Sequence, residues 1–318
     1  MKHLTTIAKV IVSICLLIWL FYQIDWQQIW HVFSHFKTVY LFTLFLLAII
    51  GILLSVWKWS HLLKNLGHSL SFTYLLKIFW IGLFFNNFLP GRTGGDLYRA
   101  YGISQKTNNK MQATISVIID RILNIVALST IGLLGYWLSD SKLTLEPNSL
   151  HLIFGIGIGL ILSLLTIYKL RHNPYFVVIK QSLGLFLRHP SKLFFPLLLA
   201  LVYQTIMILS HIVVFEGLGQ QTELPYFFCF IPLTAFATLL PISINGIGIR
   251  EGAFVISFAQ IGVASEYALA LSLIITMTTM FVSALGGVFY AISRTPSTFQ
   301  HVQNSPSPTP EEAKSSFA

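Results

Sequence analysis

Two stretches of this sequence place an arginine and a carboxylate shortly after a proline and several glycines. Residues 90–99 read PGRTGGDLYR and residues 241–251 read PISINGIGIRE. In both, an arginine follows the proline by nine positions, at Arg99 and Arg250. Proline cannot continue a helix and glycine permits a tight turn, so each stretch predicts a turn followed by a new helix. The free N–H groups at a helix start and a nearby arginine favour binding of an anion.

We therefore predict that the two turns bind an anionic ligand. Arg99 and Arg250 would hold its negative charge, while Asp96 and Glu251 would be fixed counter-ions of the empty site, so that transport runs downhill. Arg92 in the first turn suits a phosphate or a carboxylate. The alternative is that Asp96 and Arg99 share a helix face only as a structural pair. The predicted substrate-binding residues are Arg92, Gly94, Gly95, Asp96, Arg99, Gly246, Gly248, Arg250 and Glu251.

A second group of polar residues, Asp120, Arg121 and Asn124, lies inside an apolar segment. Asp120 and Asn124 are four residues apart and share one helix face. We favour a structural or coupling role, in which an ion pair locks the first turn against this helix, over direct ligand contact. Pro90 and Pro241 receive the structural role of ending a helix before each turn.

Four other polar side chains interrupt or end apolar runs. Gln204 and His211 share one face of segment 193–215, where we expect hydrogen bonds to neighbouring helices. Asn86 and Asn87 precede the first turn and are predicted to cap or hold backbone groups that the proline frees.

The composition defines the class of protein that must position these residues. Of 318 residues, 55% are hydrophobic and 10% are charged, against about a quarter charged in soluble domains. Crossing a membrane takes about 20 apolar residues. The sequence therefore predicts an all-α polytopic membrane protein. Its apolar runs lie near residues 4–22, 39–57, 73–89, 111–137, 150–168, 193–215, 225–240 and 267–292.

The basic residues orient these runs, because lysine and arginine accumulate in short cytoplasmic loops. Segments 58–72 and 104–110 are both basic, yet a single apolar run separates them. A re-entrant hairpin that turns at residues 90–95 removes this conflict, since irregular backbone at membrane depth is tolerated where it lines a cavity. The same reasoning predicts a second hairpin, with its turn at residues 241–248, that enters from the outside.

The two turns are 151 residues apart, with three predicted crossings between them. An odd number of crossings inverts the second unit. We predict two inverted repeats, about residues 1–138 and 149–292, with about six full crossings plus two re-entrant helical hairpins. Together they form one transmembrane domain, 1–292. Residues 293–318 are predicted to be a disordered cytoplasmic tail. Inverted repeats with broken helices are a recurring transporter plan.

No catalytic motif is present in the sequence. It contains no phosphate-binding loop of the G-x-x-x-x-G-K-[ST] type, no metal-ligand cluster and no G-x-S-x-G elbow. We therefore predict no enzyme activity, no cofactor and no metal. The net charge of +9 is explained by the basic cytoplasmic loops and anionic lipid headgroups, so nucleic acid is not expected as a partner.

The motifs NNFLPGRTGGDLYRAY, IIDRILNIVAL and LLPISINGIGIREGAF occur in this order and span residues 86–254. With them the sequence resembles the transmembrane region of the lysylphosphatidylglycerol synthase/flippase family, over about residues 5–292. The resemblance implies lipid translocation. It departs from the family at Asn245, where glycine is usual, and in having no soluble aminoacyl transfer domain, so synthesis by this chain is not expected. The match rests on Pro90, Gly94, Gly95, Asp96, Arg99, Asp120, Arg121, Gly246, Gly248, Arg250 and Glu251.

Taken together, these features favour a multi-pass translocase for an anionic phospholipid or a lipid-linked headgroup in the bacterial inner membrane, with both termini cytoplasmic. The alternatives are a membrane-embedded enzyme or a subunit of a lipid or glycolipid synthesis complex without transport activity. A lipid-modifying enzyme or a glycosyltransferase is the expected protein partner. The sequence leaves the lipid, the energy source and the oligomeric state open.

Overall fold

The computed structural model describes residues 34, 36–88, 94–139, 191–239 and 246–292. The predicted runs 4–22 and 150–168 and the tail 293–318 lie outside these residues. Within the described part, the chain is helical and contains no strand. Its helices are α3 (Thr38–Asn65), α4 (Phe72–Phe88), α5 (Gly94–Thr107), α6 (Lys110–Leu138), α9 (Ser191–Gly217), α10 (Leu224–Ala237), α11 (Ile249–Ala259) and α12 (Ser265–Ile292).

Four of these helices are long and apolar enough to cross a membrane: α3, α6, α9 and α12. Each has 27 to 29 residues, which at 1.5 Å per residue is about 40 Å and exceeds a hydrocarbon core of about 30 Å. Their outer faces keep large apolar side chains exposed, among them Phe42, Leu133 and Phe281. These features define a multi-pass membrane protein, as the composition predicted.

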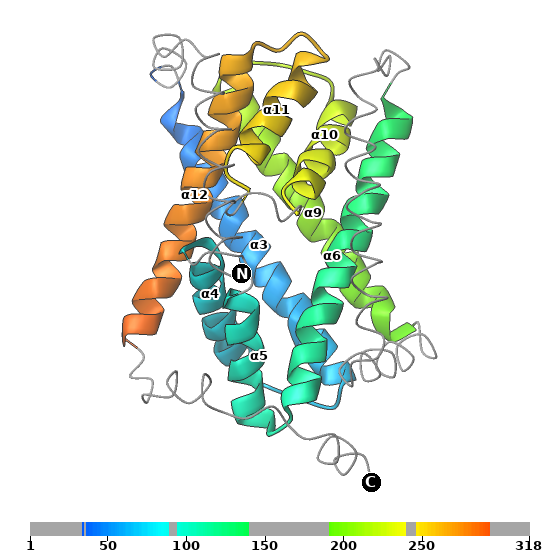
Figure 1. The fold of residues 1–318 in the computed structure, drawn as a ribbon, viewed down its shortest axis with the longest axis vertical. Coiled ribbons are helices and arrows are strands. Elements are labelled where there is room, and N and C mark those ends of the chain that lie inside the picture. The colour runs from blue at the N-terminus through cyan, green and yellow to red at the C-terminus, as the bar shows by residue number, and fades with distance from the viewer. Residues whose placement is uncertain (1–33, 35, 89–93, 140–190, 240–245, 293–318) are drawn as a thin grey trace, which may run out of the picture.

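The other four helices form two antiparallel pairs. In the first pair, Tyr74 of α4 donates a hydrogen bond to the carbonyl of Gly102 in α5, and Gly82 lies against Gly95. In the second pair, Phe227 of α10 packs on Phe258 of α11. Figure 1 places α4 and α5 in the lower half of the molecule and α10 and α11 in the upper half.

Each helix of the first half has a counterpart in the second: α3 corresponds to α9, α4 to α10, α5 to α11 and α6 to α12. When every helix is replaced by its counterpart, the same pairs of helices pack on each other. Thus α4 packs on α5 and α12, while α10 packs on α11 and α6. Likewise α5 packs on α6 and α11 packs on α12. Helix α3 contacts α4, α6 and α12, whereas α9 contacts α10, α12 and α6, and α3 and α9 pack on each other. The two halves therefore share one packing plan.

Glycines permit the equivalent contacts on the two sides of this plan. A Cβ atom on Gly286 of α12 would lie 2.2 Å from the carbonyl oxygen of Trp80 in α4. A Cβ atom on Gly135 of α6 would lie 2.4 Å from the carbonyl carbon of Phe228 in α10. Because real side chains do not approach backbone so closely, each long helix needs glycine where it crosses the first helix of a hairpin.

Charged side chains differ between the two ends of the bundle. At the lower end in Figure 1, α3, α5, α6 and α9 carry exposed lysines at or near their termini. At the upper end, exposed carboxylates stand at the end of α9 and before α10, and one exposed lysine, Lys37, precedes α3. The lysines at the lower end are Lys64, Lys106, Lys110 and Lys192, and the carboxylates are Glu216 and Glu223. This is the charge asymmetry on which the predicted orientation depends.

One feature of the predicted topology is wrong at the end of the first described helix. Apolar run 39–57 was expected to give way to a cytoplasmic loop at Lys58, but α3 continues to Asn65 and Lys58 is fully buried. The helix continues because Asp120 on α6 compensates the lysine charge inside the bundle.

Candidate functional site

A network of buried charges joins α3, α5 and α6, and Asp120 is at its centre. One carboxylate oxygen, Oδ1, lies 2.9 Å from Nζ of Lys58, and the other, Oδ2, lies 3.1 Å from Nη2 of Arg99. Asp120 is 2% exposed and Lys58 is not exposed at all. Lys58 also donates a hydrogen bond to the amide oxygen of Asn124. Both cations are thus held by one carboxylate in the interior of the bundle.

Arg99 is buried against two aromatic rings. Its guanidinium lies 4.2 Å from the ring centroid of Trp59 and 4.6 Å from that of Phe79, in cation–π contact with both. Trp59 is itself fixed by a hydrogen bond from its indole N–H to the hydroxyl of Ser116, at 3.1 Å. The residue Arg99 is 5% exposed.

Arg121 binds the second carboxylate of the network. Its Nε and Nη2 atoms lie 2.9 Å and 2.8 Å from Oδ2 of Asp96. The other oxygen of Asp96, Oδ1, lies 3.7 Å from Nη1 of Arg99. The side chain of Arg121 is 48% exposed, against 6% for Arg99. Asp96 therefore stands between an enclosed arginine and an accessible one.

The network carries more positive than negative charge. Lys58, Arg99 and Arg121 contribute three cations, while Asp96 and Asp120 contribute two carboxylates. Charges at membrane depth are rare and usually mark a binding site or a transport pathway. One excess positive charge near the middle of the bundle favours an anionic ligand.

The hairpin geometry places α5 in this network. The backbone N–H of Gly95 donates to the side-chain oxygen of Asn86 at 2.9 Å, so Asn86 caps the start of α5. A Cβ atom on Gly95 would lie 1.9 Å from the carbonyl oxygen of Gly82, so α5 packs directly against the backbone of α4. Gly94 is the first residue of α5. Asp96 and Arg99 follow at once and point toward α6.

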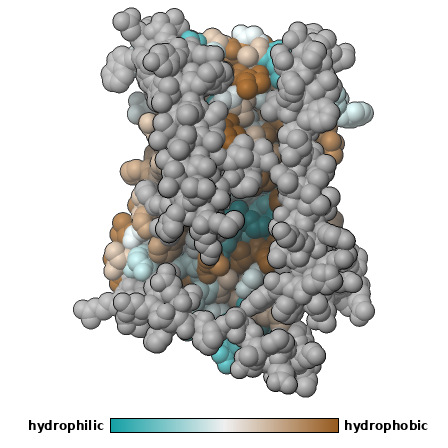
Figure 2. Space-filling model, in the orientation of Figure 1, coloured by the Kyte–Doolittle hydropathy of each residue, from teal (hydrophilic) through white to brown (hydrophobic). Residues whose placement is uncertain are grey.

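Ion pairs connect the hairpin to α6, and their structural role stays a prediction. Arg99 binds Asp120, and Asp96 binds Arg121, so two pairs connect α5 to α6. Asn124 takes part through Lys58. Arg92, Pro90 and Pro241 lie outside the described residues. Figure 2 shows hydrophilic surface in a hollow near the middle of the molecule, with hydrophobic surface around it.

In the second half, Arg250 and Glu251 lie at the start of α11. Nη2 of Arg250 is 3.1 Å from Oε1 of Glu251, and Ser272 of α12 lies 3.4 Å from the same oxygen. The other oxygen, Oε2, accepts the backbone N–H of Gly248 at 2.7 Å. Gly246 and Gly248 adopt φ of +78° and +84°, the left-handed region that favours glycine. Glu251, at 4% exposed, thus caps its own helix.

The predicted hydrogen bonds of Gln204 and His211 have different outcomes. Gln204 of α9 donates to the carbonyl of Asn124 in α6 at 3.2 Å, as expected. His211 instead pairs with the carbonyl of Met207 in its own helix and stacks on Phe254 of α11. The expectation for His211 is wrong because the carbonyl four residues earlier is within reach of the ring.

Lys58 is the site residue that sequence reasoning missed. It was counted as a loop charge since it follows an apolar run. The available signal was the apolar pattern after it, because Trp59, Leu62 and Leu63 continue the helix and are all buried.

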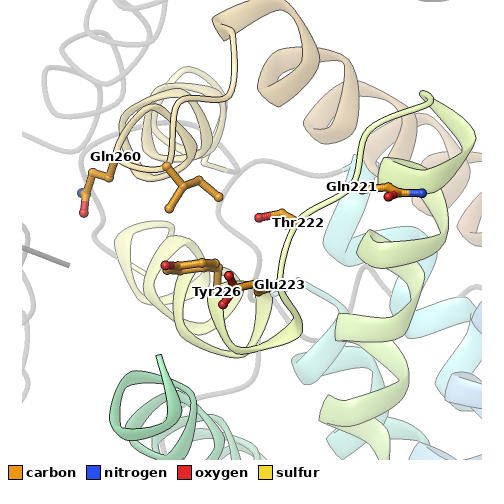
Figure 3. Close-up of a pocket in the computed structure, with 6 residues that line it drawn as sticks. Gln221, Thr222, Glu223, Tyr226 and Gln260 are labelled. Carbon is orange, nitrogen blue, oxygen red and sulfur yellow. The ribbon is translucent and has the colours of Figure 1, made fainter. Parts of the chain in front are cut away.

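A separate pocket of about 580 Å³ lies at the upper end of the second hairpin. Figure 3 shows its lining side chains on the loop before α10, on α10 itself and at the end of α11. They are Gln221, Thr222, Glu223, Tyr226, Gln260 and Ile261. None of them belongs to the charge network.

Comparison with known proteins defines the family. Residues 6–287 match the model of the lysylphosphatidylglycerol synthase TM region, and the chain belongs to this family. A similar protein is the membrane protein UPF0104 PH1989 of Pyrococcus horikoshii, 28% identical over 134 residues, which are 40% of this chain and 39% of that protein. Another is the membrane protein UPF0104 MJ1595 of Methanocaldococcus jannaschii, 32% identical over 120 residues, 36% and 35% of the two chains. The matches thus span less than two fifths of either relative. No solved structure matches this chain.

Proposed function

We propose that this protein is a lipid translocase that carries an anionic phospholipid or a lipid-linked headgroup across the bacterial inner membrane. The observation that carries the proposal is the charge network with one excess positive charge. Arg121, its accessible cation, is the twelfth of the 29 residues of α6 and lies about 17 Å from the start of the helix. A cation exposed this far from the end of the helix is better placed to bind a headgroup that is crossing the membrane than headgroups at the membrane surface.

The two hairpins would be re-entrant and the two halves inverted repeats. Their helices have 17 and 14 residues in the first hairpin and 14 and 11 in the second. At 1.5 Å per residue these are about 17 to 26 Å long and do not reach across about 30 Å of hydrocarbon. The contact plan that the two halves share supports the repeat. The lysines at the lower end support a cytoplasmic location for that end.

Asp96 and Glu251 would serve as counter-ions that stay ionised throughout the transport cycle. Each contacts an arginine at close range, Arg121 and Arg250 respectively. These carboxylates neutralise most of the positive charge of the empty site, so the carrier needs no bound proton to return to its starting state. We therefore propose that transport runs down the lipid gradient.

The alternative is a subunit of a lipid or glycolipid synthesis complex, because the family takes its description from a synthase. A lipid-modifying enzyme or a glycosyltransferase would then be the partner. In this reading the chain binds an anionic lipid and presents it, without moving it across the membrane.

Reconstitution separates these readings. The purified protein is reconstituted in vesicles that carry fluorescent phosphatidylglycerol or phosphatidylcholine in one leaflet. An impermeant reductant is then added outside, and it bleaches the fluorescent lipid of the outer leaflet. We expect protein-dependent loss of the inner-leaflet signal for phosphatidylglycerol and little for phosphatidylcholine. The variant Lys110→Gln, which removes an exposed lysine from the start of α6, is the matched control and should transport normally. Transport no faster than in protein-free vesicles would refute the translocase and favour the alternative.

A further inference from the structure

The two arginines of the first half differ in what covers them. Arg99 has carboxylates at Nη2 and Nη1 and two aromatic rings, Trp59 and Phe79, packed against its guanidinium. Among the described residues, Arg121 forms an ion pair with Asp96 alone, and nearly half of its side chain is exposed. A ligand can approach Arg121 without displacing any packed ring, whereas access to Arg99 requires Trp59 or Phe79 to move.

Asp96 holds Arg121 through only one of its two oxygens. Its other oxygen, Oδ1, is buried and has no hydrogen-bond partner among the described residues. The same is true of Nε of Arg99. These two groups belong to residues three apart on α5, and the shortest distance between their charged atoms is 3.7 Å. Buried polar atoms without partners are uncommon and costly, and a small rotation of Asp96 would bring its Oδ1 within hydrogen-bond distance of Nη1 of Arg99.

We propose that Arg121 is the cation that contacts the ligand and that Asp96 is its removable counter-ion. In the empty site, Asp96 binds Arg121. When a phosphodiester arrives, it takes the Nε and Nη2 donors of Arg121, and Asp96 turns to Arg99. This deepens the proposed function, on which it rests, by naming the ligand contact and its chemistry.

Charge balance selects the class of ligand. The empty network has one excess positive charge, and a phosphodiester carries one negative charge, so binding makes the network neutral. Arginine offers the planar pair of donors that matches two phosphate oxygens. Lys58, Asp120 and Arg99 are then positioning residues, because they anchor the new partner of Asp96 and touch no ligand.

Calorimetric titration of the full chain in a zwitterionic detergent tests the assignment, with dihexanoyl phosphatidylglycerol as the probe and dihexanoyl phosphatidylcholine as the neutral comparison. Arg121→Gln should raise the Kd for phosphatidylglycerol about 10- to 100-fold, the effect of losing a charge-assisted pair. Arg121→Lys should raise it less, because charge remains and the fork is lost. Asp96→Asn should lower the Kd about tenfold, because the competing carboxylate is gone.

Three results would overturn the proposal. They are an unchanged Kd in Arg121→Gln, an equal weakening in Asp96→Asn and Arg121→Gln, and equal binding of inorganic phosphate and the lipid probe. Lys110→Gln removes the same charge from the same helix and should leave the Kd unchanged. Folding of Arg121→Gln is expected, because Asp96 retains Arg99. Arg121-dependent binding without vesicle transport would reject the translocase while sustaining this inference.

Discussion

Replacing Asp120 with asparagine should destabilise the protein far more than removing one of the cations it holds. Asp120→Asn leaves Lys58 and Arg99 buried without their shared counter-charge, from which they stand 2.9 Å and 3.1 Å away. Breaking a buried ion pair by removing one partner costs about 3–5 kcal/mol. Because Arg99 keeps Asp96 at 3.7 Å, we expect the lower end, about 3 kcal/mol, which is a change of about 150-fold in the folding equilibrium constant.

Lys58→Met is the informative comparison. It removes a positive charge and leaves the network neutral, whereas Asp120→Asn removes a negative charge and increases the positive excess. Asp120 keeps Arg99, and the methionine side chain replaces the aliphatic part of the lysine. The main loss is the hydrogen bond to Asn124, worth about 1 kcal/mol. The predicted gap between the two variants is therefore about 2 kcal/mol.

Equilibrium unfolding in mixed micelles with increasing sodium dodecyl sulfate, followed by tryptophan fluorescence, measures both variants. Lys110→Met makes the same replacement at an exposed position of α6 and should match the unchanged protein. Equal destabilisation by Lys58→Met and Asp120→Asn would show that packing rather than charge balance holds the network, and would refute the reasoning.

Three further predictions follow from the packing and the topology. Gly286→Ala should strongly reduce the yield of folded protein, because its Cβ would lie 2.2 Å from the carbonyl of Trp80, whereas Gly252→Ala, with nothing within 4 Å, should behave normally in size-exclusion chromatography. Trp59→Phe keeps a ring against Arg99 but loses the hydrogen bond to Ser116, so it should lower the free energy of unfolding by about 1 kcal/mol in the same micelle titration. Cysteines placed at Lys106 and Glu266 should react with an impermeant maleimide from opposite sides of the membrane; reaction from one side only would contradict the inverted repeat.

Much of the fold could be read from local patterns. The apolar runs at 111–137 and 267–292 match α6 and α12 to within two residues at each end, because hydrophobicity sufficient for a membrane is a property of consecutive residues. The glycine turns were also visible, since proline and glycine restrict or free the backbone by themselves. The start of α5 and of α11 followed from them.

Contacts between residues that are far apart in the sequence could not be predicted from local patterns. Lys58 was assigned to a loop because its partner, Asp120, is 62 residues away and on another helix. Arg99 was expected to face a ligand, a role that stays a prediction, but its enclosure by Trp59 and Phe79 depends on how α3, α4 and α5 pack. No pattern within α5 contains that information.

The sequence by itself determined the class, the long helices, the helix start after each glycine stretch and the kinds of charge there, because backbone preferences and hydropathy act over neighbouring residues. Only the tertiary structure decided which charges neutralise each other and which remain accessible. Arg99 and Arg121 are the same residue type in similar apolar surroundings, yet their side chains are 6% and 48% exposed. That difference arises from the contacts of three packed helices, since the energy of a charge inside a membrane depends on what stands within a few ångströms of it.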